Sequence, residues 1–217
     1  MDYYSKWSTY RRKVLDSLQE KYKSLYHGIV LDIGGRDRGI FKKPKNQVEK
    51  WIFADINEDY NPDVLLDVTD MGQVNTESID VVNALELFEH VDDISSGLNE
   101  CYRVLKKGGN LILSVPYLFP IHADPYDFQR WSDKKWRMEL IKTGFTIDKF
   151  IITGKYYTTL GDFFKIYLKT LRKPLRRIAS VFFPILDKMV RLDQKSNVKY
   201  HDKLNKFHSG YFIIAFK

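Results

Sequence analysis

Two glycines and an acidic residue form the part of the sequence with the clearest potential for chemistry. Residues 28–39 read Gly-Ile-Val-Leu-Asp-Ile-Gly-Gly-Arg-Asp-Arg-Gly, and the run Trp-Ile-Phe-Ala ends at Asp55, roughly 20 residues after Gly34. A short apolar run that stops at a glycine pair is typical of a buried parallel strand entering a tight turn. With an acid at the tip of the next strand, the pattern predicts a site that holds an adenosine ribose by its hydroxyls. The alternative is a turn of the same kind that binds nothing.

Arg36 narrows the choice of adenosine cofactor. A dinucleotide-binding turn has three glycines, and the middle one lets the backbone approach a pyrophosphate. Here Gly34 and Gly39 fill the outer places, and Arg36 stands in the middle. S-adenosylmethionine carries no phosphate and needs only the turn and the ribose acid. The sequence therefore favours S-adenosylmethionine over a nicotinamide or flavin dinucleotide.

The segment 116–131 holds a second group of reactive side chains. His122 has the only side chain there that titrates near neutrality, so we expect it to act as the base that removes a proton from an acceptor hydroxyl. Asp127 could orient that imidazole, and Arg130 could hold an acidic substrate or pair with Asp127 instead. We expect Tyr117 and Asp124 to contact the acceptor as well. The alternative for His122 and Asp127 is a structural role in a proline-bearing loop.

A metal ion is not expected from the spacing of these residues. His122, Asp124 and Asp127 resemble a set of metal ligands. Three such residues without a further ligand are weak support for a metal centre.

An α/β domain must position these side chains. Apolar runs without helical period predict strands, and apolar residues at helical spacing predict helices. The helix at 133–143 is closed by Gly144, and the helix that ends near Leu105 is stopped by Lys106-Lys-Gly-Gly109. Residues 40–50 show little periodicity, so the usual crossover helix after the first strand should be short or missing. Strands are expected at 29–33, 51–55, 63–66, 79–84, 110–115, 145–152 and 211–216, and further helices at 5–25 and from Ile94 to Leu105.

A series of motifs carries a family resemblance. They are Leu-Asp-Ile-Gly-Gly (31–35), Ala-Asp-Ile (54–56), Asp-Val-Thr-Asp (67–70), Ser-Ile-Asp-Val-Val (78–82), Leu-Phe-Glu-His-Val (87–91), Tyr-Arg-Val-Leu-Lys-Lys-Gly-Gly (102–109) and Gly-Phe (144–145). Over residues 28–153 the chain resembles class I S-adenosylmethionine-dependent methyltransferases of type 11. Residues 122–131 are also similar to a segment of methyltransferases encoded among genes for cell-surface polysaccharide synthesis.

The resemblance implies a Rossmann-like sheet of seven mostly parallel strands whose last strand is antiparallel. It also implies methyl transfer to an oxygen or nitrogen acceptor, with a sugar of a cell-surface glycan or its precursor as the expected substrate. The alternative is a non-catalytic, methyltransferase-like binding or scaffold module. The cofactor-binding positions implied are Asp32, Gly34, Gly35, Asp55, Ile56, Asp67, Val68, Asn83, Leu85 and Glu86. Glu86 could instead cap the following backbone, and His90 is expected to be a structural partner of its loop.

The basic charge of the chain is concentrated in one segment. Residues 155–206 carry 13 Lys and Arg against four acidic residues, whereas the whole chain has a net charge of +7. An apolar stripe runs through this segment, and Pro174 should divide or kink its helix. We expect either a helical insertion that packs its stripe on the domain or a surface helix lying on anionic lipid. Nucleic acid is disfavoured because no binding motif is present.

One domain over residues 1–217 is therefore expected. It would comprise an N-terminal helix (1–27), a cofactor-binding core (28–154), the basic helical insertion (155–206) and a final strand (207–217). A single cysteine, Cys101, suits a reducing compartment, and no apolar run is long enough to span a bilayer. We accordingly expect a cytoplasmic enzyme that is peripheral to the inner face of the membrane if the insertion binds lipid.

Overall fold

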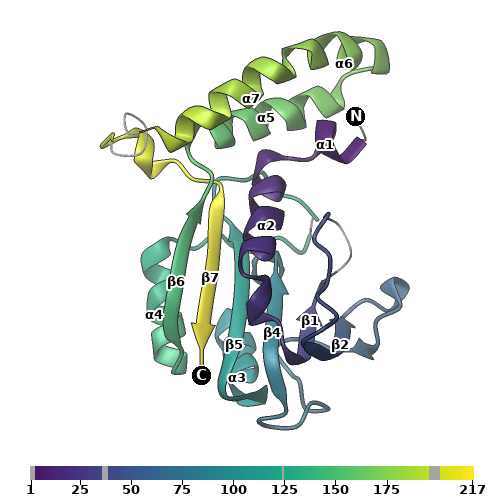
Figure 1. Ribbon diagram of the computed structural model, residues 1–217, viewed down its shortest axis with the longest axis vertical. Helices are drawn as coiled ribbons and strands as arrows, with labels where there is room; N and C mark the ends of the chain where they lie inside the picture. The colour runs from purple at the N-terminus through teal and green to yellow at the C-terminus, as the bar shows by residue number, and fades with distance from the viewer. Residues whose placement is uncertain (1–2, 36–38, 124, 196–200) are drawn as a thin grey trace.

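The computed structural model of the protein describes residues 3–35, 39–123, 125–195 and 201–217. Its centre is a seven-stranded sheet in the order β3-β2-β1-β4-β5-β7-β6 (Figure 1). Strand β7 is antiparallel to β5 and β6, and the pairs from β3 to β5 are parallel, as predicted. The strands are β1 (Gly28–Ile33), β2 (Val48–Asp55), β3 (Val64–Leu65), β4 (Ile79–Leu85), β5 (Leu105–Pro116), β6 (Thr146–Thr153) and β7 (Gly210–Phe216).

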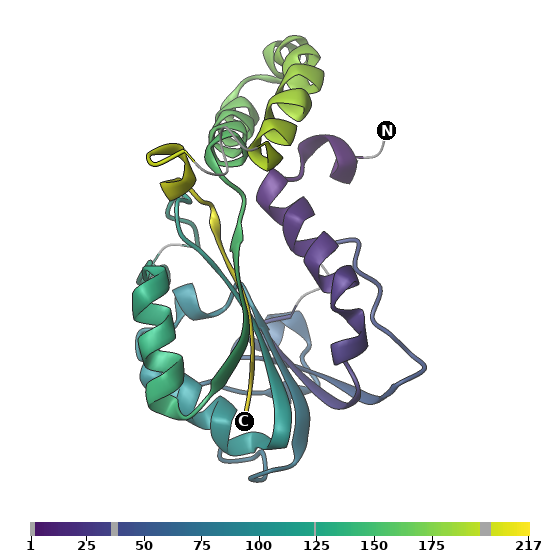
Figure 2. The same cartoon turned by 60° about the vertical axis from the view of Figure 1, so that its left-hand side comes forward.

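Helices cover both faces of the sheet (Figure 2). Helix α2 (Tyr10–Lys21) lies on one face, and α3 (Ile94–Val104) and α4 (Asp133–Thr143) lie on the other. Side chains alternate along each strand. Leu31 and Ile33 of β1 therefore pack into the core beneath α3 and α4, whereas Val30 packs into the smaller core beneath α2.

The first crossover lacks its usual helix over the described residues 39–47. Phe41 packs on the ring of Tyr26 instead, with ring centroids 5.5 Å apart, and Tyr26 in turn packs on Trp51 at 5.3 Å. The prediction of a missing crossover helix holds for this part of the chain. Arg36, which argued against a dinucleotide cofactor, lies outside the described residues.

Two predicted boundaries were wrong. Helix α3 ends at Val104, and β5 begins at once with Leu105, so residues 106–109 belong to the strand and do not form a glycine stop. Leu105 pairs with Ile79 in the sheet, and a register shift accommodates the residues that follow. The predicted helix over 5–25 is divided into α1 (Tyr3–Trp7), α2 and a short 3-10 turn (Lys23–Leu25), because Thr9 caps α2 through the backbone N–H of Arg12.

The segment between β6 and β7 folds into helices that rise above one end of the sheet (Figure 1). They are α5 (Tyr156–Thr170), α6 (Lys173–Ala179) and α7 (Phe183–Arg191), and 3-10 turns follow at Ser180–Phe182, Leu192–Gln194 and Leu204–Lys206. Pro174 lies in the first turn of α6, so it divides the helices as predicted. None of the helices that the structure describes combines the length and the apolar character needed to cross a lipid bilayer.

Two buried aspartates hold this insertion in place. Asp162 of α5 accepts hydrogen bonds from the backbone N–H groups of Tyr10 and Arg11 at the start of α2. Asp193 accepts from the backbone N–H groups of Lys155, Tyr157 and Thr158 at the start of α5. Each carboxylate thus satisfies helix N-terminal donors that have no partner within their own helix.

Candidate active site

A cavity of about 320 Å³ lies at the carboxyl ends of β1, β2 and β4. This is the edge at which open α/β sheets bind ligands. Six of the predicted cofactor-binding residues line it, namely Gly34, Asp55, Ile56, Asp67, Val68 and Glu86. The strand ends thus bring these residues together around one space, which we call the strand-end cavity.

The two acids of this cavity are held by short local turns. One oxygen of Asp55 accepts a hydrogen bond of 2.9 Å from the backbone N–H of Asn57. One oxygen of Asp67 accepts from both the backbone N–H and the hydroxyl of Thr69 at 2.8 Å. Such turns fix the direction of a short acidic side chain, so both carboxylates are oriented within the cavity wall.

The remaining wall of the strand-end cavity is apolar and comes largely from loops. Ile56 is 68% exposed although it is a large apolar residue, and Tyr60, Tyr126 and Phe128 are exposed beside the same space. Ile56 was predicted from the sequence, whereas the three aromatic residues were not. They stand in irregular segments without periodicity, so only their aromatic character could have indicated them.

Gly34 is required by the shape of the turn. Its φ of +68° is in the left-handed region that favours glycine. A Cβ atom added there would lie 3.1 Å from Cδ1 of Leu87. The first glycine of the predicted turn therefore permits the chain to pass between β1 and the segment after β4.

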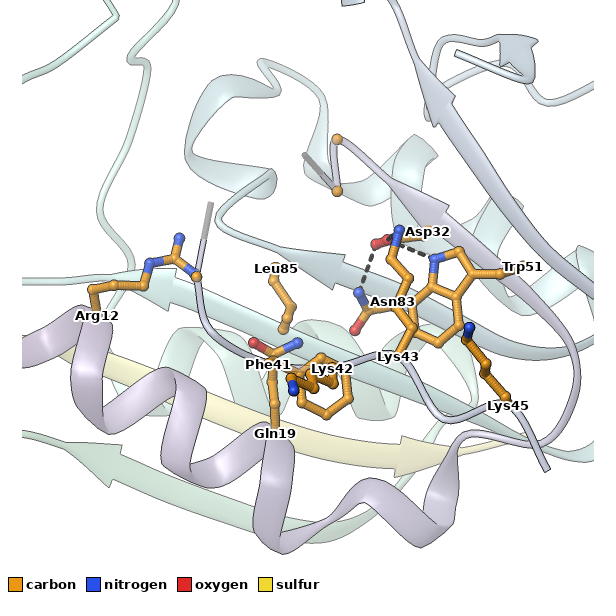
Figure 3. Close-up of a pocket in the computed structure, with 13 residues that line it drawn as sticks. Arg12, Gln19, Asp32, Phe41, Lys42, Lys43, Lys45, Trp51, Asn83 and Leu85 are labelled. Atoms are coloured by element: carbon orange, nitrogen blue, oxygen red, sulfur yellow. Dashed lines mark hydrogen bonds and ion pairs between the residues drawn. The ribbon is translucent and has the colours of Figure 1, made fainter. Parts of the chain in front are cut away.

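The other predicted cofactor-binding residues line a second cavity, of about 360 Å³, on the α2 side of the sheet (Figure 3). They are Asp32, Gly35, Asn83 and Leu85, and Gly34 borders both cavities. Asp32 accepts hydrogen bonds of 2.8 Å from Nε1 of Trp51 and 2.6 Å from Nδ2 of Asn83. The wall also includes Arg12, Lys42, Lys43 and Lys45. The predicted cofactor-binding residues are thus divided by the sheet between two cavities.

Glu86 is tied to the N-terminal helix. Its backbone has a φ of +57°, which is unusual for a residue other than glycine. Its carboxylate forms an ion pair with Arg11 and accepts a 2.5 Å hydrogen bond from the hydroxyl of Ser114. Burial alone would raise the pKa of Glu86, but Arg11 and Ser114 lower it below its usual value. Glu86 is therefore an ionised partner of α2 at the margin of the cavity.

The loop after β5 brings three predicted residues together. The backbone N–H of His122 donates to Asp127 at 2.8 Å, and Nδ1 of His122 lies 3.2 Å from the same carboxylate oxygen. Arg130 forms an ion pair with Asp127, with a hydrogen bond of 2.7 Å from Nη2. Burial opposes ionisation, yet the bonds from Arg130 and His122 lower the pKa of Asp127 to about 2. Arg130 thus pairs with Asp127, one of the two roles expected for it.

The two other predicted acceptor contacts do not join this group. Tyr117 stacks on His208, with ring centroids 4.7 Å apart, and packs beside Tyr211 of β7. It is not among the residues that line the strand-end cavity. Asp124 lies outside the described residues. The acceptor-binding role of both residues remains a prediction.

A cluster of Glu89, His90 and His122 adjoins the strand-end cavity, which His90 lines directly. The rings of His90 and His122 are 5.0 Å apart. Burial, and then the neighbouring Glu86, raise the pKa of Glu89 to about 8. Burial also lowers the pKa of His90. His90 contacts the loop at Tyr126, in agreement with its expected structural role, but the cluster itself was not predicted.

Solved structures that align with this chain identify its fold. An S-adenosylmethionine-dependent methyltransferase from Archaeoglobus fulgidus aligns with a TM-score of 0.61 and 18% identity, over 95% of this chain and 94% of that one. This is the methyltransferase fold. The [4+2]-cyclase SpnF has the same fold, with a TM-score of 0.59 and 12% identity over 94% of this chain and 80% of that one. The methyltransferase fold therefore occurs in proteins named for different activities.

Sequence comparison adds a narrower match. A family model described as "Methyltransferase domain" matches residues 43–113, which run from the first crossover into β5. A ubiquinone biosynthesis O-methyltransferase of Pseudomonas savastanoi pv. phaseolicola is 40% identical over 63 residues. That match covers 26% of this chain and 27% of the relative. The chain thus spans about a quarter of the length of the curated relatives it matches.

These comparisons agree with the methyltransferase class and the cofactor predicted from the motifs. The match begins at residue 43, after the glycine turn, whereas the predicted resemblance began at residue 28. The relatives give no support to the narrower resemblance to methyltransferases of polysaccharide gene clusters.

Proposed function

We propose that this protein is an S-adenosylmethionine-dependent methyltransferase that acts on a hydroxyl oxygen. The observation that carries the proposal is the strand-end cavity, where two oriented acids, an apolar wall and the Glu89–His90–His122 cluster meet. An adenosine needs acids for its hydroxyls and amino group and apolar surface for its ring. A methyl transfer to oxygen needs, in addition, a group that takes up the hydroxyl proton.

The residues of the cavity fit the proposed cofactor. Asp55 would hold the ribose hydroxyls, Asp67 would face the adenine amino group, and the exposed side chain of Ile56 would be covered by the ring. When bound, S-adenosylmethionine supplies a methyl group activated by its sulfonium. Asp32 and Asn83 are hydrogen-bonded to one another on the α2 side of the sheet, so their predicted contact with the cofactor remains a proposal.

The chain itself would contribute orientation and proton removal. His122 is the proposed base, and Asp127 holds its ring through Nδ1, so that Nε2 faces the cluster. Phe128 and Glu89 are joined by a backbone hydrogen bond of 2.9 Å, which fixes this loop against the segment after β4. Holding an acceptor hydroxyl beside the cofactor would supply most of the rate enhancement.

The proposed acceptor atom is oxygen, and the proposed acceptor is a sugar. The relatives are named as O-methyltransferases of ubiquinone biosynthesis, which favours oxygen over nitrogen. We retain a sugar hydroxyl of a cell-surface glycan or its precursor as the proposed acceptor, on the basis of the resemblance of residues 122–131. A non-catalytic binding module is the competing function, because a shared fold does not determine activity.

Titration calorimetry with S-adenosylmethionine and its demethylated product tests the proposal. Wild-type protein should bind both. Asp55→Ala should weaken binding by about 100-fold, since it removes hydrogen bonds to a charged acceptor. The control is Asp59→Ala, which removes a nearby exposed acid that does not line the cavity.

Absence of heat with both ligands, or equal affinity in wild type and Asp55→Ala, would contradict the proposal. Binding without turnover of any hydroxyl acceptor would favour the non-catalytic module.

We also propose that the insertion contacts an anionic membrane surface. Val181 is 73% exposed and Ile178 is 66% exposed, and basic residues of α6 and α7 flank them. Of the predicted apolar stripe, Leu168 is buried but Tyr167 and Leu175 remain exposed, so packing on the domain covers only part of it. Exposed apolar side chains together with basic residues suit the boundary of an anionic bilayer.

Liposome flotation distinguishes this contact from simple packing. Val181→Ser should reduce recovery with anionic vesicles, whereas Ile141→Ser, at a site on α4 that is 65% exposed, should not. Equal recovery with neutral and anionic vesicles, or no recovery with either, would leave the insertion as a packed element only.

A further inference from the structure

Three side chains present lone pairs to one point beside the strand-end cavity. Oε1 of Glu89 lies 3.8 Å from Nε2 of His90 and 4.0 Å from Nε2 of His122. The nearest ligand atoms of the three residues all lie within 4.8 Å of one another. Small side-chain movements would therefore bring all three to coordination distance of a shared ion, which is about 2.0 to 2.2 Å for nitrogen and carboxylate ligands of zinc.

The hydrogen bonds on the far sides of both imidazoles set their protonation. Nδ1 of His90 lies 2.6 Å from the backbone carbonyl oxygen of Tyr126, which can only accept, so this nitrogen carries the proton. Nδ1 of His122 faces the carboxylate of Asp127, which is likewise an acceptor. In each neutral ring Nε2 then has a lone pair and no proton. Both free lone pairs face Glu89.

The carboxylate of Glu89 is buried without a hydrogen-bond partner in the part of the chain that the structure describes. The residue is only 2% exposed, and neither of its carboxylate oxygens has a hydrogen-bond partner among the described residues. The neighbouring guanidinium groups are engaged elsewhere, Arg11 with Glu86 and Arg130 with Asp127. A buried carboxyl group without a partner is costly. Its position opposite two imidazole lone pairs is accounted for if a cation binds between them.

We propose that Glu89, His90 and His122 form a binding site for a divalent transition-metal ion. Two imidazoles and one carboxylate match the ligands of catalytic zinc sites, which leave a position open. Imidazole ligands favour zinc and similar ions over magnesium. Asp127 and the Tyr126 carbonyl orient the two imidazoles from behind, as second-layer partners of metal ligands do. This site differs from the His122, Asp124 and Asp127 spacing, from which no metal was expected.

The position of the site gives the ion a role. His90 lines the strand-end cavity, and the side chains of His90 and His122 are 23% and 37% exposed, so an acceptor could reach the open position. A cation there would lower the pKa of an acceptor hydroxyl. It would replace the free Nε2 of His122 as the activating group. This role, unlike the metal binding itself, rests on the proposed methyl transfer.

Metal binding is tested by titrating chelator-treated, dialysed protein with zinc chloride by calorimetry. One ion per chain should bind, and magnesium chloride should compete weakly. Glu89→Gln and His122→Ala should each weaken zinc binding by at least about 100-fold, and Asp127→Asn by about 10-fold. Cobalt chloride provides a second readout, since its visible absorption reports imidazole coordination and should be lost in Glu89→Gln.

The control is His27→Gln, which removes an exposed imidazole outside the cluster and should leave zinc affinity unchanged. Circular dichroism of each variant confirms that it is folded. No saturable binding of zinc or cobalt, or equal affinity in wild type, Glu89→Gln and His122→Ala, would overturn the proposal. The assay uses no cofactor or acceptor. Zinc binding without S-adenosylmethionine binding would therefore retain the metal site while rejecting the proposed methyl transfer.

Discussion

Buried carboxylates occur in two regions of this molecule, and their surroundings differ sharply. In the helical insertion, Asp162 and Asp193 accept two and three backbone N–H groups at the starts of α2 and α5. Beside the strand-end cavity, Glu89 is as deeply buried but accepts no hydrogen bond from the described residues. The acids of the two regions are thus equally buried and differ in their hydrogen bonds.

The difference follows from what each region must do. A carboxylate at a helix N-terminus satisfies donors that would otherwise be buried without partners, and it is favoured by the helix dipole. A carboxyl group without partners destabilises the folded state and can be accounted for if it binds a ligand. Removing the two kinds of acid should consequently have opposite signatures in stability and in binding.

Asp193→Ala should produce the largest loss of stability. It would leave three backbone N–H groups at the start of α5 without their acceptor, and we expect the free energy of unfolding to fall by about 2 to 4 kcal/mol. Urea denaturation followed by circular dichroism measures this change. Asp202→Ala, at an exposed acid, is the matched control and should shift stability little. A loss below about 0.5 kcal/mol in Asp193→Ala would remove the contrast between the two regions.

Lys165 of α5 should make the stability of the helical insertion depend on pH. Its side chain is 1% exposed, lies 3.9 Å from the Tyr10 ring centroid and donates to the carbonyl of Ser8 at 3.0 Å. Burial and then the charge of Lys13 lower its pKa to about 8. Between pH 8 and the pKa of the unfolded chain, near 10.5, the unfolded state binds the extra proton. The contribution of Lys165 to stability should therefore rise with pH in this window.

The expected size of this rise is about 1 to 2 kcal/mol between pH 7.5 and pH 9.5. Urea midpoints of wild type and Lys165→Met at the two pH values measure it by difference. Burial raises the pKa of Asp162, an acid that faces the ammonium group, to about 6, which lies below this interval. The same pH dependence in wild type and variant would show that Lys165 remains charged throughout.

Glu89→Gln should have the smallest effect on stability. The substitution removes no hydrogen bond of the described structure, so the free energy of unfolding of the metal-free protein should change by no more than about 1 kcal/mol. Glu139→Gln is the informative counterpart, because Glu139 is buried but paired with Lys135 and Ser95. Urea denaturation of both variants should show the larger loss in Glu139→Gln. The reverse order would make Glu89 a structural acid.

The arrangement of strands could be predicted because each strand is a short apolar run with a clear end. The ends at Ile33 and Asp55 were placed correctly, and the antiparallel last strand followed from the family resemblance. The division of the predicted cofactor residues between two cavities was not foreseen. It follows from the alternation of side chains along β1, which directs Asp32 to the α2 side and Ile33 to the other.

The Glu89–His90–His122 cluster could not be predicted from spacing. Residues 89 and 122 are joined through the loop after β5, whose course depends on the pairing of Asp127 with Arg130 and of Phe128 with the backbone of Glu89. His122 was predicted to act as a base because an imidazole titrates near neutrality. His90 was predicted to be structural, because the sequence around a histidine in a turn does not indicate which distant residues it will contact.

The capping of α2 by Asp162 also constrains the order in which the chain can fold. Asp162 lies 152 residues after Tyr10, so the start of α2 gains these hydrogen bonds only when most of the chain has left the ribosome. Strand β7 lies between β5 and β6, and the edge of β5 consequently stays unpaired until residues 210–216 arrive. An unpaired strand edge in a nascent chain is prone to aggregation. Chaperones that shield exposed strands should therefore increase the yield of this protein.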